Sequence, residues 1–184
     1  MQDNIIVKPS VEKQFDRFLR QGRVLFFSAP CGFGKTAVAE ALLSSREVLR
    51  LSADSAGFKL PSAEADWQIL LLDDLQDMQE EQDWNALCEL IRACPERRFV
   101  LLSRGTPPGS LMAFQYTGLM TVLEADDLLF DADDVRRLFQ LSGANVTDSE
   151  IDGILKESVG YPLGVAITAR CMFPDKPWTP ELVA

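Results

Sequence analysis

The chain has 184 residues and carries 28 Asp and Glu against 18 Lys and Arg, so its formal net charge is −10. This length fits one compact domain with a small appendage, and the charge argues against a nucleic-acid surface, because affinity for nucleic acid comes largely from neutralised phosphates. The absence of histidine excludes Ser-His and Cys-His nucleophile mechanisms, and no apolar run approaches the ~18 residues of a membrane span.

The first two predicted elements are a helix and a buried strand. Residues 10–21 place apolar side chains at the spacing of one helical face, and Gly22 is typical of a helix end. Residues 23–28 then read as a strand, with an uninterrupted apolar run from Val24 to Phe27. We expect this strand to be buried.

A glycine-containing loop follows this strand and precedes a helix-forming stretch that runs to about Ser45. Its glycines allow successive backbone N–H groups to curl around a phosphate, and the helix directs its positive end at the same anion. We therefore predict a phosphate-binding loop, in which Lys35 reaches the β- and γ-phosphates and Thr36 binds Mg²⁺. The alternative is a strand-to-helix turn that carries Gly-Lys-Thr by chance. The predicted nucleotide-binding residues are Ala29 (where glycine is usual), Pro30, Cys31, Gly32, Phe33, Gly34, Lys35 and Thr36.

Two further strands are predicted next, at residues 47–52 and 68–74, with a loop over residues 53–66 between them. The second is continuously apolar, as a strand buried on both faces requires, and ends in two aspartates. An acid at this place holds Mg²⁺ in proteins with a phosphate loop, and we assign that role to Asp73. For Asp74 two interpretations stay open: it polarises the attacking water, or it caps the next turn.

A helix over residues 84–94 leads to a fourth strand, residues 98–104, and a cluster of turn residues. Arg104 ends this strand, where it would sense the γ-phosphate; the alternative is an ordinary surface arginine. Residues 120–124 read as the last strand, and the rest of the chain is predicted to be helical. Asp131 caps one helix, residues 147–150 form a capping box, and Pro162 occupies the first turn of another helix.

Five segments in series resemble the signal-transduction ATPases with numerous domains (STAND), and among them the LuxR-family, MalT-like transcriptional regulators. Residues 28–36, SAPCGFGKT, are similar to the family loop SPAGFGKT, and residues 70–75, LLLDDL, resemble its Walker B strand. Residues 101–108, LLSRGTPP, match its sensor segment, and residues 123–130, LEADDLLF, match its passage into the lid. Residues 160–164, GYPLG, resemble a motif whose proline packs near the nucleotide base, which implicates Pro162.

The resemblance implies an α/β fold of the P-loop NTPase type, with a parallel sheet of strand order 5-1-4-3-2, helices on both faces, and a small helical lid. It divides the chain into a nucleotide-binding domain, residues 1–125, and a lid segment, residues 126–184, that precedes regulatory and DNA-binding domains of a longer regulator. Bound ATP or ADP with Mg²⁺ is implied, with slow hydrolysis, self-association in the ATP state, and DNA contact only through the missing domains.

Two other functions fit the same motifs, an AAA-type ATPase motor and a small P-loop kinase. A kinase usually has a basic lid, whereas the segment after Ala125 is acidic. Arg136 or Arg137 would serve as an arginine finger of a motor, but both fit an ordinary helix surface equally well. The four cysteines form no CxxC pair, and the chain starts without a secretory signal. We therefore expect a cytoplasmic protein with reduced thiols and no membrane partner.

Overall fold

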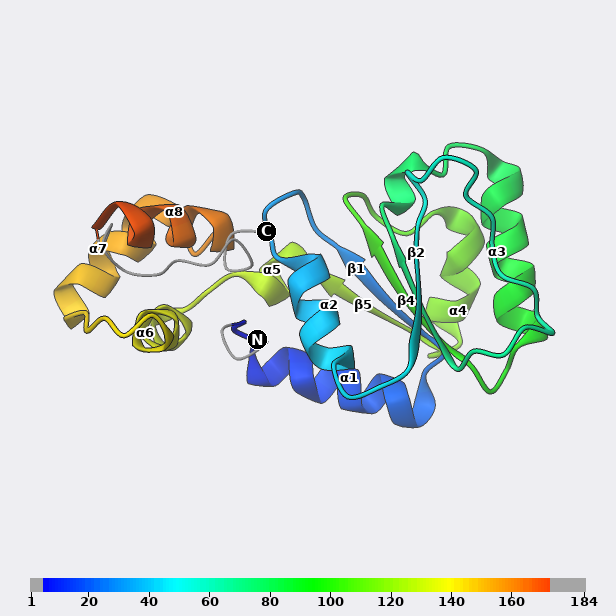
Figure 1. Cartoon of the computed structure of the whole chain (residues 1–184), viewed down its shortest axis with the longest axis horizontal. Coiled ribbons are helices and arrows are strands. Elements are labelled where there is room, and N and C mark those ends of the chain that lie inside the picture. The colour runs from blue at the N-terminus through cyan, green and yellow to red at the C-terminus, as the bar shows by residue number, and fades with distance from the viewer. Residues whose placement is uncertain (1–4, 173–184) are drawn as a thin grey trace.

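The computed structural model describes residues 5–172 and has a five-stranded parallel sheet at its centre (Figure 1). The strand order is β2-β3-β4-β1-β5, which confirms the predicted fold class and the predicted order 5-1-4-3-2. The strands are β1 (Val24–Ser28), β2 (Val48–Ser52), β3 (Ile69–Asp73), β4 (Arg98–Ser103) and β5 (Met120–Glu124).

The register aligns the carboxyl ends of the strands along one edge of the sheet. Ser28 at the end of β1 pairs with Ser103 of β4, and Ser52 at the end of β2 pairs with Asp73 of β3. Residues that follow these positions therefore emerge side by side, which is where open α/β sheets bind their ligands.

Helices cover both faces of the sheet. Leu25 and Phe27 of β1 pack with α1 (Pro9–Gln21) and α2 (Lys35–Leu43), whereas Val24 and Phe26 pack with α3 (Glu81–Ala93) and the short α4 (Met112–Tyr116) on the other face. The side chains of these four β1 residues are fully buried. Alternating residues of a strand point to opposite faces, so burial on both sides demands the continuous apolar run seen in the sequence.

The segment after the sheet is helical, as predicted, and forms a lid beside the sheet (Figure 1). Its helices are α5 (Ala125–Leu128), α6 (Ala132–Leu141), α7 (Asp148–Ser158) and α8 (Pro162–Met172). Asp131 and Thr147 are the N-caps of α6 and α7, each within a capping box. The lid has a core of its own, which also contains Ile6 from the N-terminal segment.

The sequence prediction was incomplete in the short elements. Helix α3 begins at Glu81, three residues before the predicted start, and three one-turn elements were not predicted: the 3-10 turns η1 (Leu75–Asp77) and η2 (Gly109–Leu111), and α4. One turn is too short for a helical period to be visible in a sequence. No helix within residues 5–172 is long and apolar enough to cross a membrane. The division at residue 125 stays a prediction, and residues 1–4 and 173–184 lie outside the described residues.

Candidate nucleotide-binding site

The loop between β1 and α2 has the backbone conformation that its glycines permit. Gly32 and Gly34 have φ values of 80° and 73°, in the left-handed region that other residues rarely adopt. Gly34 is also the N-cap of α2, and no side chain caps this helix. The first-turn N–H groups of a helix have no intrahelical partners, so they and the positive end of the helix dipole suit an anion.

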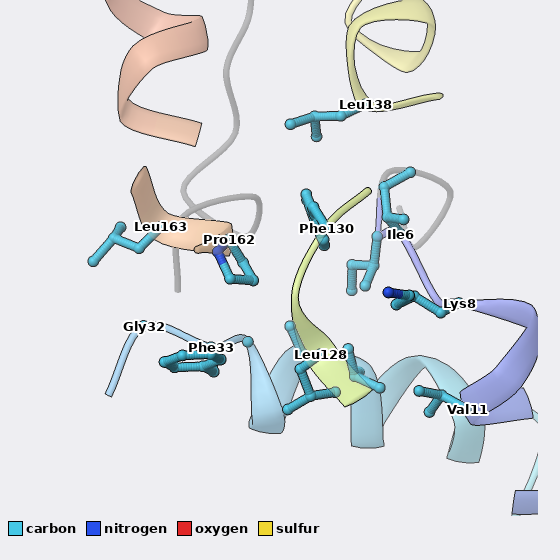
Figure 2. Close-up of a pocket in the computed structure, with 14 residues that line it drawn as sticks. Ile6, Lys8, Val11, Gly32, Phe33, Leu128, Phe130, Leu138, Pro162 and Leu163 are labelled. Carbon is cyan, nitrogen blue, oxygen red and sulfur yellow. The ribbon is translucent and has the colours of Figure 1, made fainter. Parts of the chain in front are cut away.

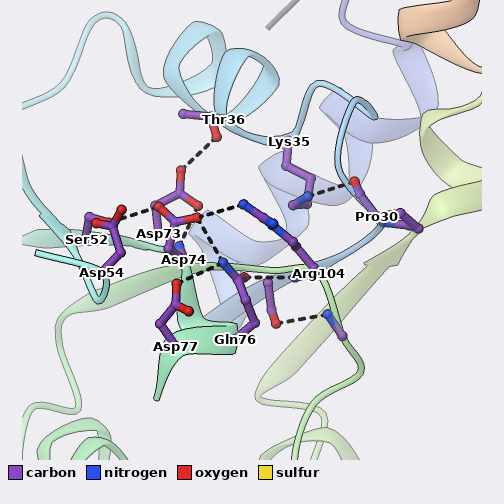
Figure 3. A network of polar contacts seen from close by, with 12 residues as sticks. Pro30, Lys35, Thr36, Ser52, Asp54, Asp73, Asp74, Gln76, Asp77 and Arg104 are labelled. Atoms are coloured by element: carbon purple, nitrogen blue, oxygen red, sulfur yellow. Dashed lines mark hydrogen bonds and ion pairs between the residues drawn. The ribbon is translucent and has the colours of Figure 1, made fainter. Parts of the chain in front are cut away.

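Lys35 lies inside this loop. Its side chain is buried, and its Nζ donates hydrogen bonds to the carbonyl oxygens of Ala29 at 2.6 Å and Pro30 at 3.0 Å (Figure 3). Burial lowers the pKa of the Lys35 ammonium, and the nearby Asp73 carboxylate opposes that shift. The loop therefore holds a partly desolvated cation, for which an anion such as phosphate is a strong partner.

Thr36 and Asp73 meet beside the loop. Thr36 Oγ1 donates to Asp73 Oδ2 at 2.7 Å, while Asp73 Oδ1 accepts from the backbone N–H of Asp74 at 2.7 Å. Mg²⁺ binds oxygen ligands and usually keeps several waters, taking one or two protein groups and the phosphates of a substrate. A hydroxyl and a carboxylate oxygen next to the phosphate loop fit that requirement.

Asp74 follows β3 in the left-handed region, with φ 54°. Non-glycine residues in this conformation cluster at functional sites, because the surrounding structure must stabilise them. Three side chains contact its carboxylate: Gln76 Nε2 donates at 2.9 Å, an Arg104 guanidinium nitrogen lies 3.8 Å away, and Ser52 Oγ lies at 3.0 Å, sharing its one proton between Asp74 and Asp54 at 2.6 Å (Figure 3). The structure thus brings Asp74 and Arg104 together beyond the carboxyl ends of β3 and β4.

Ser52 and Gln76 are site residues that the sequence analysis missed. Gln76 in η1 donates to Asp74 through its side-chain amide nitrogen, and its Oε1 accepts a hydrogen bond from the backbone N–H of Arg104 at 3.2 Å. A signal for Ser52 was present, because it ends the strand beside Asp73. None was visible for Gln76, since η1 is a single turn.

A mostly apolar pocket adjoins the loop, between α1, α2 and the lid (Figure 2). Pro162 and Phe33 of the loop both line it, and the place of Pro162 near a nucleotide base stays a prediction. The Lys8 side chain lies in the wall, where Nζ donates to the Leu129 carbonyl oxygen and pairs with buried Asp134 at 3.7 Å. The other lining residues are Ile5, Ile6, Val11, Gly32, Gly34, Ala37, Val38, Leu128, Phe130, Leu138 and Leu163.

Solved structures with a similar fold are ATPases of several kinds. The replication initiator DnaA, bound to AMPPCP and single-stranded DNA, superimposes with a TM-score of 0.65 at 16% identity, covering 95% of this chain and 65% of that one. A mutant of the Thermotoga maritima RuvB protein gives 0.62 at 16% identity, covering 92% and 64%. A STAND protein with a tetratricopeptide repeat sensor from Pyrococcus horikoshii gives 0.60 at 10% identity, covering 91% and 30%.

The chain has the fold of the P-loop NTPases. Its P-loop is the segment from Ala29 to Thr36, at the carboxyl end of β1. The chain spans less than two thirds of the length of the DnaA and RuvB structures. No protein-family profile matches it, and no curated protein matches it in sequence. Superpositions at identities this low show the fold alone, so function has to be argued from the site.

Proposed function

We propose that this domain binds ATP and ADP with Mg²⁺ and acts as a slowly hydrolysing nucleotide switch. The observation that carries the proposal is the arrangement around the P-loop. Buried Lys35 lies inside the loop, the Thr36–Asp73 pair flanks it, and an apolar pocket with Pro162 adjoins it. These features supply a cation for the phosphates, oxygen ligands for Mg²⁺, and an apolar surface for the base.

Each side chain has a distinct task in this proposal. Lys35 binds the β- and γ-phosphates, while Thr36 and Asp73 would hold Mg²⁺, directly or through water. When bound, Mg²⁺ would neutralise the negative charge that develops on the phosphates. Asp74 accepts a proton from the attacking water, whose oxygen bonds to the γ-phosphorus as the bond to the ADP oxygen breaks. Arg104 donates to the γ-phosphate and so reports its presence.

We further propose that the domain belongs to a LuxR/MalT-type transcriptional regulator, in which ATP promotes self-association and transcription activation. The five motifs in series support this assignment, and a STAND protein is among the similar folds. Inducer sensing and DNA contact belong to other domains of such a regulator. Nucleotide can bias the lid only by binding its arrangements with different affinity.

An AAA-type motor is the alternative, because the chain also superimposes on the RuvB branch migration motor. A motor of this kind needs an arginine that reaches a neighbouring subunit. Arg136 is engaged within the lid, where its guanidinium donates to Asp133 at 2.6 Å and to Asp148 at 2.8 Å. Arg137 also contacts its own chain, at 3.5 Å from the Val7 carbonyl oxygen and 3.8 Å from the Asp134 carboxylate. These contacts favour an ordinary role for both arginines and hence the switch.

Calorimetric titration of ADP and ATP with Mg²⁺ tests nucleotide binding. We expect binding by the wild type and by Lys156→Ala, whose lysine is exposed on α7, and loss of binding in Lys35→Ala. A wild type that binds neither nucleotide contradicts the proposal. Sedimentation velocity of the same samples tests the switch, since ATP should produce a larger species than ADP does. Equal sedimentation in both nucleotides would leave a binding module without the proposed self-association.

A further inference from the structure

The lid contacts the P-loop through two hydrogen bonds to loop carbonyl groups. Tyr161 Oη donates to the Cys31 carbonyl oxygen at 2.9 Å, and the backbone N–H of Leu163 donates to the Gly32 carbonyl oxygen at 3.1 Å. The Tyr161 ring also packs on the Phe33 ring, with centroids 5.1 Å apart. These contacts join Tyr161, between α7 and α8, and Leu163, in the first turn of α8, to the middle of the loop.

The lid holds this turn in place from its other side. The Phe130 N–H, at the entrance to the lid, donates to the Gly160 carbonyl oxygen at 2.8 Å. A Cβ on Gly160 would lie 2.5 Å from the Phe130 carbonyl oxygen, so the two backbone segments touch directly. The backbone next to Tyr161 is therefore held by contacts within the lid as well as by its contacts with the loop.

The two hydrogen bonds to the Cys31 and Gly32 carbonyl oxygens fix the direction of the loop N–H groups that a phosphate would contact. In a planar trans peptide the C=O and N–H bonds point in opposite directions. Because the Cys31 carbonyl points to the lid, the Gly32 N–H of the same peptide points away from the lid. In the next peptide the Gly32 carbonyl points to the lid, so the Phe33 N–H also points away from it. Both amides then face the opposite side of the loop, where successive N–H groups can form an anion-binding concavity.

The approach of the lid to the loop is close enough to require glycine. A Cβ on Gly32 would lie 2.0 Å from Tyr161 Oη and 2.9 Å from the Leu163 side chain, and the backbone φ of +80° is itself unfavourable for other residues. Gly34 has a similar φ, yet a Cβ there would meet no atom of residues 5–172 within 4 Å. Contact with the lid is thus a separate constraint at Gly32.

We propose that Tyr161 is a positioning residue for nucleotide binding, acting through the P-loop backbone. Its hydroxyl, with the Leu163 amide, keeps the Gly32 and Phe33 N–H groups turned toward the phosphates. The inference rests on the proposed nucleotide site. Because coupling between sites is reciprocal, bound nucleotide must in turn stabilise the lid on the loop, which gives the lid a direct report of occupancy.

Tyr161→Phe tests this proposal because it removes the hydroxyl and keeps the ring on Phe33. Tyr116→Phe is the matched control, since Tyr116 is the other tyrosine of the chain and is 82% exposed on α4. We expect ADP affinity to fall about three- to tenfold in Tyr161→Phe, the usual worth of one hydrogen bond, and to be unchanged in the control. The thermal unfolding midpoint of nucleotide-free Tyr161→Phe should fall by no more than the few degrees that one lost hydrogen bond costs, so the variant stays folded in the titration.

Hydrogen exchange of the Leu163 amide provides a second readout, which a loss of overall stability would not reproduce. ADP with Mg²⁺ should slow this exchange in the wild type, and Tyr161→Phe should exchange faster and respond less. Unchanged affinity in Tyr161→Phe, or an equal loss in Tyr116→Phe, overturns the proposal. Failure of the nucleotide site itself is distinguishable: no protein then binds ADP, and the inference falls with the proposed function even where Leu163 exchange differs between variants.

Discussion

At the scale of single residues, the site depends on how Asp74 is held. Its carboxylate is fixed by Ser52 from β2, Gln76 from η1 and Arg104 after β4. Gln76 joins two of these residues, because it binds the Asp74 side chain and the Arg104 backbone. A proton acceptor must stay within hydrogen-bond reach of the attacking water, and removing Gln76 takes one hydrogen bond from Asp74 and one from the Arg104 backbone at once.

We therefore expect Gln76→Ala to slow ATP hydrolysis about 10- to 100-fold, as for a misplaced catalytic group, with little change in ADP affinity. Single-turnover hydrolysis and calorimetric titration measure the two quantities separately. Gln79→Ala, at an exposed position nearby, is the control and should hydrolyse ATP at the wild-type rate. Equal rates in Gln76→Ala and wild type would show that Asp74 needs no such support.

Lys35 makes nucleotide affinity depend on pH. Burial holds its pKa below the ordinary value of 10.5, whereas a bound phosphate anion favours the ammonium and raises the pKa again. The charged form binds phosphate, so affinity is full below the pKa of the free protein and falls as pH rises through it. We expect ADP affinity to decline at alkaline pH before 10.5 is reached, with proton uptake on binding.

Calorimetry in buffers of different ionisation enthalpy counts those protons. The measurement belongs in a Cys31→Ser background, because the Cys31 side chain acts electrostatically on Lys35. Lys35→Arg supplies the comparison, since a guanidinium stays charged throughout; where that variant binds ADP, its affinity should not fall. A wild-type affinity that is flat across the alkaline range would contradict the assigned role of Lys35.

At the scale of elements, the N-terminal ends of the lid helices α6 and α7 are stabilised by capping side chains. Asp131 accepts hydrogen bonds from the N–H groups of Asp133 and Asp134, both at 3.0 Å. The hydrogen bond from the Asp134 backbone is the main cause that lowers the pKa of Asp131 below 3.8, with the nearby Lys8 ammonium adding to it against the effect of burial. A lowered carboxyl pKa means that the stabilisation is present above 3.8 and is lost as pH falls through the folded-state value.

Asp131→Ala should accordingly lower the free energy of unfolding by about 1 kcal/mol at neutral pH, the usual cost of a lost N-cap. Asp133→Ala is the neighbouring control, because its carboxylate is 87% exposed and forms a surface pair with Arg136, a kind of pair that contributes little. Urea denaturation at neutral and acid pH measures both variants. A difference between Asp131→Ala and wild type that persists unchanged in acid would contradict the titration.

At the scale of the whole molecule, the N-terminal segment connects the sheet to the lid. Ile6 precedes α1, yet it is 4% exposed and packs in the lid core with Val135 and Phe139. It also lines the apolar pocket. Lys8, two residues later, pairs with Asp134 of α6. Packing of the N-terminal segment against α6 therefore supports both the lid and the pocket.

Ile6→Ala should lower the free energy of unfolding by about 2–4 kcal/mol, the range for truncating a buried aliphatic side chain, and should weaken ADP binding as well. Ile167→Ala truncates a lid isoleucine that is 51% exposed, so its effect should stay within about 0.5 kcal/mol. Urea denaturation followed by circular dichroism compares the two. Equal effects would show that the N-terminal segment does not stabilise the lid.

The sequence by itself determined the features that depend on near neighbours. The apolar runs of the sheet, the glycine loop with Lys35, and the caps at Asp131 and Thr147 were readable because each depends on side chains a few residues apart. The strand order came from the family resemblance. Tertiary structure alone decided which distant segments meet: Gln76 with Arg104, Tyr161 with the loop, and Ile6 with the lid. The residues that meet are 28 positions apart in the sequence for Gln76 and Arg104, and 130 apart for Cys31 and Tyr161. Only the packing of the sheet and the lid brings their atoms into contact.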